Sequence, residues 1–260
     1  LRNLRSLSMT CDSLTALPPT IGRLTALAQL NLGNNELRNL PDSFSSLTAL
    51  TQLELSGNQF EEIPQCLSSI PSLTSLSIAG NKIAAVSEPL CSRLTRLETL
   101  NLSNNCLVAV PAALGSLSGL HALMLSGNSI AAIPPEFSRL VQLEELQVSR
   151  NNLAVVPSCL YSLGSLKKLD LSANRISSFA PPLGRIVGLV SMTSLNLGDN
   201  ELTELPAEIG RLPRLEVIYA SSNQLTQLPD LSGLLSSLKA LDVRSNKISA
   251  IQLSVFQCHD

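Results

Sequence analysis

A pattern of about 23 residues returns along the whole chain of 260 residues and limits the folds open to it. Residues 27–41 read L-x-x-L-x-L-x-x-N-x-L-x-x-L-P, and Asp12 fills the N position of the first repeat. In the later repeats that position holds Asn35, Asn58, Asn81, Asn105, Asn128, Asn151, Asn174, Asn200, Asn223 and Asn246. Short repeats of constant length stack into a solenoid, so residues 1–260 are predicted to form a single domain of about eleven repeats.

The leucine spacing within a repeat predicts a short strand. Leu30 and Leu32 alternate with a period of two, which turns both side chains to one face. The strand of the next repeat should lie beside it in parallel, about 4.8 Å away. The asparagine falls where the chain leaves the strand, and its amide can satisfy backbone groups that the turn leaves unpaired. The ten asparagines are therefore predicted to form a buried structural ladder.

A proline and a short helical segment complete each repeat. The proline stands six residues after the N position at Pro18, Pro41, Pro64, Pro111, Pro134, Pro157, Pro206 and Pro229. Apolar residues three apart follow it, as in Ile209 and Leu212, and indicate one or two helical turns. The fold class is therefore α/β: a curved horseshoe with parallel strands on its concave face and short helices or 3-10 turns on its convex face.

Two repeats depart from the common length. The interval from Asn174 to Asn200 is 26 residues, with its extra residues between Leu183 and Met192, and predicts a longer helix on the convex side. The interval from Asn81 to Asn105 is 24 residues, with Ser87 where proline is expected.

The motif L-P-x-x-I-G-x-L-x-x-L-x-x-L-x-L-x-x-N resembles that of intracellular leucine-rich-repeat proteins with 23-residue repeats, of the plant intracellular Ras-group, Scribble-type and Ras–phosphatase scaffold classes. The resemblance covers essentially the whole chain. It implies a leucine-rich-repeat solenoid that acts as a protein–protein interaction scaffold in intracellular signalling. The same repeats occur in Roco kinases and GTPases, adenylate cyclases and bacterial effectors. The alternative is therefore a regulatory or substrate-recognition region of a larger enzyme: a phosphatase, Roco protein, cyclase or ubiquitin ligase.

The cysteines and the chain ends bear on compartment and context. Six cysteines are scattered with no C-x-x-C pair, which favours a reducing, cytoplasmic compartment. Cys258 and His259 are adjacent but have no second pair nearby in sequence, so no metal site is predicted. The first residues fall inside a repeat, and Gln252 replaces the last expected proline. We therefore expect a segment of a longer protein with flanking domains.

Charge and motifs exclude several functions. A net charge of −2 does not favour nucleic acid or an anionic membrane as partner. No apolar run reaches 18 residues, so membrane insertion is not expected. No hydrolase elbow, phosphate loop, kinase motif or H-E-x-x-H motif occurs, so neither catalytic residues nor a cofactor are predicted.

Side chains that point out from the strands are the candidate binding residues. The predicted protein-binding set on the concave face is His121, Met124, Glu145, Gln147, Arg150, Lys168, Asp170, Tyr219, Asp242 and Arg244. Tyr, Met and Arg are enriched at interfaces, and these three residue types stand out from a face of Ser and Asn. A second interpretation is that the charges neutralise one another, because Glu144 should neighbour Lys167 and Glu145 should neighbour Lys168. A partner on the N-terminal or convex surface also remains open.

Overall fold

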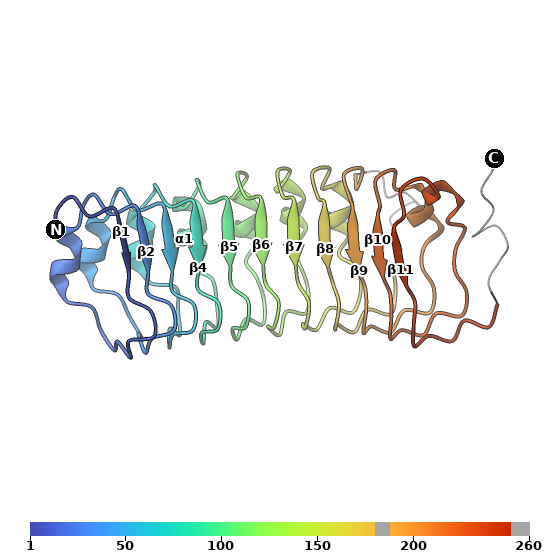
Figure 1. Ribbon diagram of the computed structural model, residues 1–260, viewed down its shortest axis with the longest axis horizontal. Coiled ribbons are helices and arrows are strands. Elements are labelled where there is room, and N and C mark those ends of the chain that lie inside the picture. The colour runs from blue at the N-terminus through green and yellow to red at the C-terminus, as the bar shows by residue number, and fades with distance from the viewer. Residues whose placement is uncertain (180–187, 251–260) are drawn as a thin grey trace. The chain divides into compact units, whose positions relative to one another are not determined.

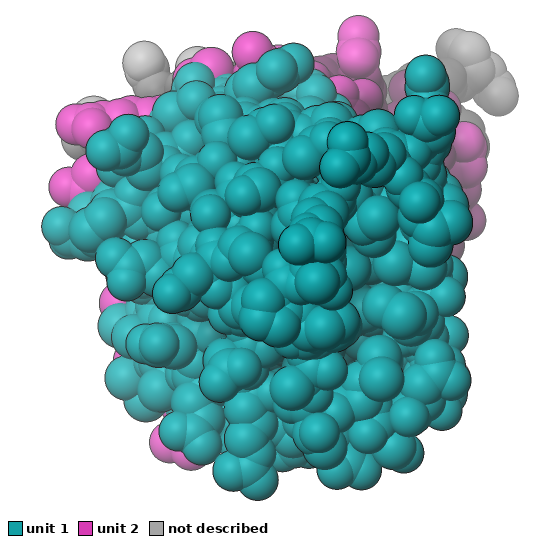
Figure 2. Space-filling view, turned by 90° about the vertical axis from the view of Figure 1, so that its left-hand side faces the viewer, with its two compact units in different colours: residues 1–129 teal, residues 130–260 magenta. Residues whose placement is uncertain are grey.

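The computed structural model describes residues 1–179 and 188–250 and forms two compact units. Unit 1 comprises residues 1–129 and unit 2 comprises residues 130–260 (Figure 2). The longer helix predicted between Leu183 and Met192 falls largely outside the described residues, and so do Gln252, Cys258 and His259.

Both units are built from three-residue strands that pair in parallel and in the order of the sequence (Figure 1). The strands of unit 1 are β1 (Ser6–Ser8), β2 (Gln29–Asn31), β3 (Gln52–Glu54), β4 (Ser75–Ser77), β5 (Thr99–Asn101) and β6 (Ala122–Met124). Those of unit 2 are β7 (Glu145–Gln147), β8 (Lys168–Asp170), β9 (Ser194–Asn196), β10 (Val217–Tyr219) and β11 (Ala240–Asp242). The predicted short parallel strands, one per repeat, are therefore confirmed.

A layer of short helical segments lies behind the strands of each unit (Figure 1). In unit 1 these are η1 (Pro19–Arg23), η2 (Asp42–Ser46), η3 (Gln65–Ser69), α1 (Glu88–Arg93) and η4 (Ala112–Ser116), where η marks a 3-10 helix. In unit 2 they are η5 (Pro135–Arg139), η6 (Ser158–Ser162), η8 (Ala207–Arg211) and η9 (Ser232–Leu234). Both layers of the predicted α/β solenoid are present.

The repeated proline sets the start of the helical segment. Pro41, for example, lies immediately before η2 with φ −67° and extended backbone, and seven of the eight prolines occupy this N-cap position. A fixed φ suits that site, and the missing N–H costs nothing at a helix start. Pro229 differs, because η9 begins three residues later with Leu231 as its N-cap.

The core of each unit lies between the strands and the helical layer. The two leucines of each strand motif enter it, as do Leu30 and Leu32 at 2% and 0% exposure. Aromatic rings are few, but Phe44, Phe60 and Phe137 are fully buried at positions that hold leucine or isoleucine in other repeats. Regular stacking lets small aliphatic side chains fill the space at high density, which explains the low aromatic content.

The 24-residue repeat absorbs its extra residue in the helical layer. Where other repeats have a five-residue 3-10 helix, this one forms the six-residue α-helix α1, with Ser87 as its N-cap in place of proline. The strands on either side, β4 and β5, keep their register, with Leu76 opposite Leu100. The extra residue therefore leaves the pairing of the neighbouring strands unchanged.

Each ladder asparagine joins its own repeat to the one before it. Asn58 Oδ1 accepts the backbone N–H of Leu37 at 3.0 Å. Its Nδ2 donates to the carbonyl oxygens of Leu32 at 3.0 Å and of Leu55 at 2.9 Å. One side chain thus satisfies three backbone groups from two repeats, as predicted for the ladder.

The pattern holds along both units, with differences in burial. Seven ladder asparagines are buried, whereas Asn128, Asn174 and Asn246 are half-buried. Asp12 in the first repeat is exposed, and its contribution is its backbone N–H, which donates to Asn35 Oδ1 at 3.1 Å. The first repeat is therefore bonded to the second through Asn35, and the side chain of Asp12 does not take the place of a ladder asparagine.

The five cysteines of the described residues are free thiols. Cys11 and Cys106 are exposed, while Cys66 is half-buried and Cys91 and Cys159 are buried. Burial raises the pKa of Cys66, Cys91 and Cys159 from 9.0 to about 11. These three thiols are therefore protonated at neutral pH and are poor nucleophiles.

Replacing a buried ladder asparagine should destabilise the chain strongly. Asn58→Leu leaves the buried N–H of Leu37 without a partner, at roughly 1–3 kcal/mol. It also removes one of the two amide donors from the carbonyls of Leu32 and Leu55, which keep those of Asn35 and Asn81. We expect the free energy of unfolding, measured by urea titration, to fall by roughly 1–3 kcal/mol. The exposed Asn39→Leu in the same unit is the control and should change it by less than about 0.5 kcal/mol. Equal effects of the two substitutions would mean that the ladder is not structural.

The cysteines should differ in alkylation rate. In the folded chain at pH 7.5, iodoacetamide should modify Cys11 and Cys106 first, because these two residues are exposed. A raised pKa shifts thiolate formation to higher pH, so modification of Cys159 should accelerate about tenfold per pH unit between pH 7.5 and 9.5. Peptide mapping by mass spectrometry measures both. Modification of Cys159 as fast as Cys106 at pH 7.5 would contradict the burial.

Candidate functional site

The strand face, formed by the side chains that point outward from the strands, is the candidate site. In unit 2 the strand register aligns two columns on it. The column between the paired leucines is Gln147, Asp170, Asn196, Tyr219 and Asp242. The column before the second leucine is Glu145, Lys168, Ser194, Val217 and Ala240. The parallel alignment of neighbouring strands that the repeat spacing predicts is therefore confirmed within unit 2.

Most charges on this face neutralise one another. Lys167 Nζ lies 2.7 Å from Glu144 Oε2, and Lys168 Nζ lies 3.9 Å from Glu145 Oε2. Both contacts join neighbouring repeats, as the second interpretation of these charges predicted. Exposed pairs of this kind contribute about 0–1 kcal/mol each. They leave β7 and β8 with little net charge to attract a partner.

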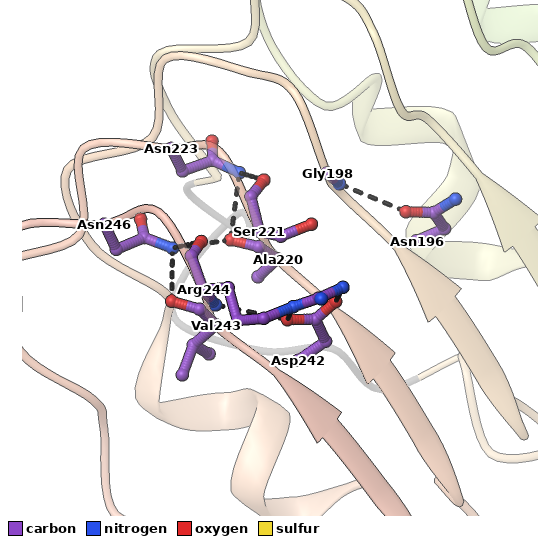
Figure 3. Close-up of polar contacts among 9 residues, drawn as sticks. All are labelled: Asn196, Gly198, Ala220, Ser221, Asn223, Asp242, Val243, Arg244 and Asn246. Atoms are coloured by element: carbon purple, nitrogen blue, oxygen red, sulfur yellow. Dashed lines mark hydrogen bonds and ion pairs between the residues drawn. The ribbon is translucent and has the colours of Figure 1, made fainter.

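Two more pairs extend this arrangement to β11. Lys239 Nζ lies 2.8 Å from Glu216 Oε2, again across one repeat. Arg244 binds Asp242 in a fork, with Nε to Oδ1 at 2.9 Å and Nη2 to Oδ2 at 2.8 Å (Figure 3). The Arg244 guanidinium and backbone N–H hold the pKa of the Asp242 carboxyl below its usual range.

Several outward side chains also close the turn that follows their strand. Asp170 Oδ1 accepts the backbone N–H of Ser172 at 3.0 Å, and Asn196 Oδ1 accepts that of Gly198 at 3.1 Å (Figure 3). Asp242 does the same for Arg244 at 3.1 Å. Asp170 and Asp242, predicted as binding residues, thus have a structural role that the sequence reasoning missed. The signal for it was a short polar side chain placed two residues before a turn amide.

Arg150 occupies a constrained backbone position. Its φ is 53°, in the left-handed region. The residue before each ladder asparagine is left-handed in ten repeats: Asn34, Gly57, Gly80, Asn104, Gly127, Arg150, Ala173, Asp199, Ser222 and Ser245. Gly and Asn adopt this conformation easily, so the Asn and Gly common in this column reflect the backbone. Arg150 projects a long cation from a position that does not favour it.

Tyr219 is the large side chain of unit 2 that stands out on the strand face. It is 42% exposed and lies between Asn196 and Asp242 in register. Within the described part of the chain, no hydrogen bond involves its hydroxyl group. The half-buried Val217 lies two residues before it on β10. Its ring therefore offers apolar surface and a free polar tip beside the Asp242–Arg244 pair.

Two predicted residues belong to unit 1. Met124 ends β6, is half-buried and pairs in register with Asn101. His121 is exposed, and its Nδ1 lies 2.8 Å from the carbonyl oxygen of Gly119. The remaining predicted residues, from Glu145 to Arg244, belong to unit 2. Whether any of the ten binds a partner stays a prediction.

The described residues carry no arrangement typical of a metal centre or a membrane anchor. Over residues 1–179 and 188–250, no three His, Cys, Asp or Glu side chains come together as a cation site. In the same residues, no helix has both the length and the apolar character needed to span a bilayer.

Two substitutions at Arg150 should test whether its left-handed backbone is strained. Arg150→Gly removes the left-handed cost and should raise the free energy of unfolding by about 0.5 kcal/mol. Arg150→Val places a β-branched residue at positive φ and should lower it by roughly 1–2 kcal/mol. Urea denaturation measures both. Equal stability of the two variants would show that this backbone position is not constrained in solution.

Comparison with solved structures places the fold. A leucine-rich-repeat protein of Leptospira interrogans is 26% identical with a TM-score of 0.72, and the match covers 98% of this chain and 76% of that one. An internalin of Listeria monocytogenes is 24% identical with a TM-score of 0.79, covering 93% of this chain and 68% of that one.

A plant receptor is similar as well. The Arabidopsis receptor kinase HAESA, solved in complex with a peptide hormone and a co-receptor, is 29% identical with a TM-score of 0.78. The match covers 94% of this chain and 42% of that one. No curated protein sequence matches this chain.

The family itself is shown by the repeats. The leucine rich repeat family matches residues 2–60, 71–130 and 118–176, and a two-copy form of the repeat matches residues 213–255. Together these segments cover most of the chain. The chain belongs to the leucine-rich repeat family.

Proposed function

We propose that this chain binds another protein through the strand face of unit 2, with Tyr219 as the central contact. Leucine-rich-repeat proteins generally mediate protein–protein interactions, and the fold is typically a non-catalytic binding scaffold. The observation that carries the proposal is the exposed Tyr219 ring in a column of otherwise polar side chains.

The surroundings of Tyr219 suit an interface. The half-buried Val217 and Ala240 are register neighbours in the adjacent column and add apolar surface. Tyrosine gives a large contact area at low entropic cost, because its ring has few rotatable bonds. The Asp242–Arg244 pair beside it is polar and exposed, as the rim of an interface usually is.

The charged pairs on β7 and β8 supply specificity more than affinity. Lys168 Nζ and Glu145 Oε2 are 3.9 Å apart, which is a long ion pair. A partner with complementary charges can therefore replace this ion pair with contacts of its own. Exposed pairs at a rim chiefly affect association rate and partner choice. Arg150 and Gln147 belong to the binding surface proposed for unit 2. His121 and Met124 belong to unit 1 and are proposed as further contacts on the strand face of that unit.

Location and context extend the proposal. Free, partly buried cysteines and 23-residue repeats support a cytoplasmic scaffold in signalling, of the plant Ras-group, Scribble or Ras–phosphatase scaffold type. The complex of HAESA with a peptide hormone supports peptide or protein recognition by this fold. The second candidate, a recognition region of a larger phosphatase, Roco protein, cyclase or ubiquitin ligase, uses the same surface with catalysis elsewhere.

Photo-crosslinking identifies the partner, and titration tests the site. A benzoylphenylalanine at position 219 captures proteins from a lysate of the source cells, and mass spectrometry identifies them. Isothermal titration of the purified partner then compares wild type with Tyr219→Ala. We expect at least about 30-fold weaker binding, the scale of an interface hot spot at roughly 2 kcal/mol. The melting temperature should change little, because the ring is exposed.

Val155→Ala is the matched control. Val155 is 56% exposed, lies in unit 2 and is outside the strand face, in the loop before Pro157. It should bind with wild-type affinity. Unchanged affinity in Tyr219→Ala would move the binding site to another surface. Equal losses in both variants would point to a general effect on the fold.

A further inference from the structure

A hollow of about 410 Å³ lies on the strand face of unit 1, over β1 to β4. Two buried leucines form its floor, and the rest of its lining is polar. Outward side chains that line it include Ser8, Gln29, Asn31, Gln52, Glu54 and Ser77. Glu54 is the one charged side chain among the lining residues.

Glu54 lacks a cationic partner among the described residues. Its Oε1 accepts the backbone N–H of Ser56 at 2.6 Å, which closes the turn after β3. The ion pairs of Glu144, Glu145, Glu216 and Asp242 lie in unit 2. Glu54 is half-buried between Asn31 and Ser77, so neighbouring polar side chains, rather than a cation, surround its charge.

Asp242 shows what a carboxylate can do at this position of the repeat. It occupies the same column of its own unit and also accepts the N–H two residues on. In addition, its two oxygens hold the guanidinium of Arg244 at 2.9 and 2.8 Å. Capping the turn therefore leaves the carboxylate able to bind a guanidinium in a fork. The repeat of Glu54 has Ser56 where the repeat of Asp242 has Arg244, so the place beside Glu54 is open to an external cation.

The side chains around Glu54 suit an extended peptide. Gln29 and Gln52 are exposed and adjacent in register, and each offers an amide that donates and accepts. Amide side chains of this kind can pair with the N–H and C=O groups of a peptide backbone. The neutral hydroxyl and amide lining adds no charge that would compete with Glu54 for a cation.

We propose that this hollow binds an extended peptide segment that carries an arginine, with the guanidinium paired to Glu54 and the peptide backbone held by Gln29 and Gln52. The site belongs to unit 1 alone and does not depend on the function proposed for unit 2.

NMR titration of the whole chain tests the site with a minimal probe, acetyl-Gly-Ser-Arg-Ser-Gly-amide. The Ser56 backbone amide is the reporter, because it donates to Glu54. The arginine peptide should shift this resonance in a saturable manner. The same peptide with citrulline in place of arginine, which keeps the shape and removes the charge, should bind at least tenfold more weakly. The difference in affinity between the arginine and citrulline peptides should decrease as the salt concentration increases.

Glu54→Gln keeps an oxygen for the Ser56 N–H and removes the charge, so the chain should stay folded and lose the preference for arginine over citrulline. Glu61→Gln makes the same charge change in unit 1, outside the hollow, and should retain the preference. Equal shifts by the arginine and citrulline peptides would overturn the proposal, as would no shift of Ser56 or an unchanged preference in Glu54→Gln. The Tyr219→Ala variant should respond to the probe like wild type, which separates this site from the one in unit 2.

Discussion

The amide of one asparagine per repeat, bonded to backbone groups of two successive repeats, is the interaction on which each unit depends. Where the chain leaves the strand it turns inward, and its N–H and C=O groups are cut off from water. Asn81, for example, satisfies the N–H of Phe60 and the carbonyls of Leu55 and Ile78. An unpaired buried group costs roughly 1–3 kcal/mol, so the turn is stable only beside a neighbour of the same kind.

That turn also decides what the strand face can display. The residue before the asparagine must be left-handed, and the residue between the paired leucines is drawn into capping the turn. Many polar residues on this face are therefore explained by the fold. Tyr219 and Glu54 are different, since the ring has no structural task and the carboxylate has capacity beyond its cap. These two positions are where the face departs from the needs of folding.

The repeat pattern was enough to predict the strands, the proline-led helical turns and the asparagine ladder, because each depends on spacing alone. Side-chain partners were harder. The Lys167–Glu144 contact followed from register, but the Asp242–Arg244 fork depends on side-chain rotamers within one repeat. The left-handed backbone at Arg150 has a trace in the sequence, because Gly and Asn recur immediately before the ladder asparagines. These residues were interpreted as part of a polar surface, and no backbone constraint was inferred from them. The hollow around Glu54 depends on the size of several side chains together, which no single motif encodes.

Native-state hydrogen exchange tests the central claim most directly. The backbone amides of Leu37, Phe60 and Ile83 donate to asparagine side chains at 2.9–3.0 Å and lie outside the strands. If the ladder holds the repeats together, these amides exchange as slowly as those of the buried strand leucines Leu53 and Leu76. Exchange at the rate of exposed loop amides such as Ala85 would show that the asparagines do not bind the repeats to one another.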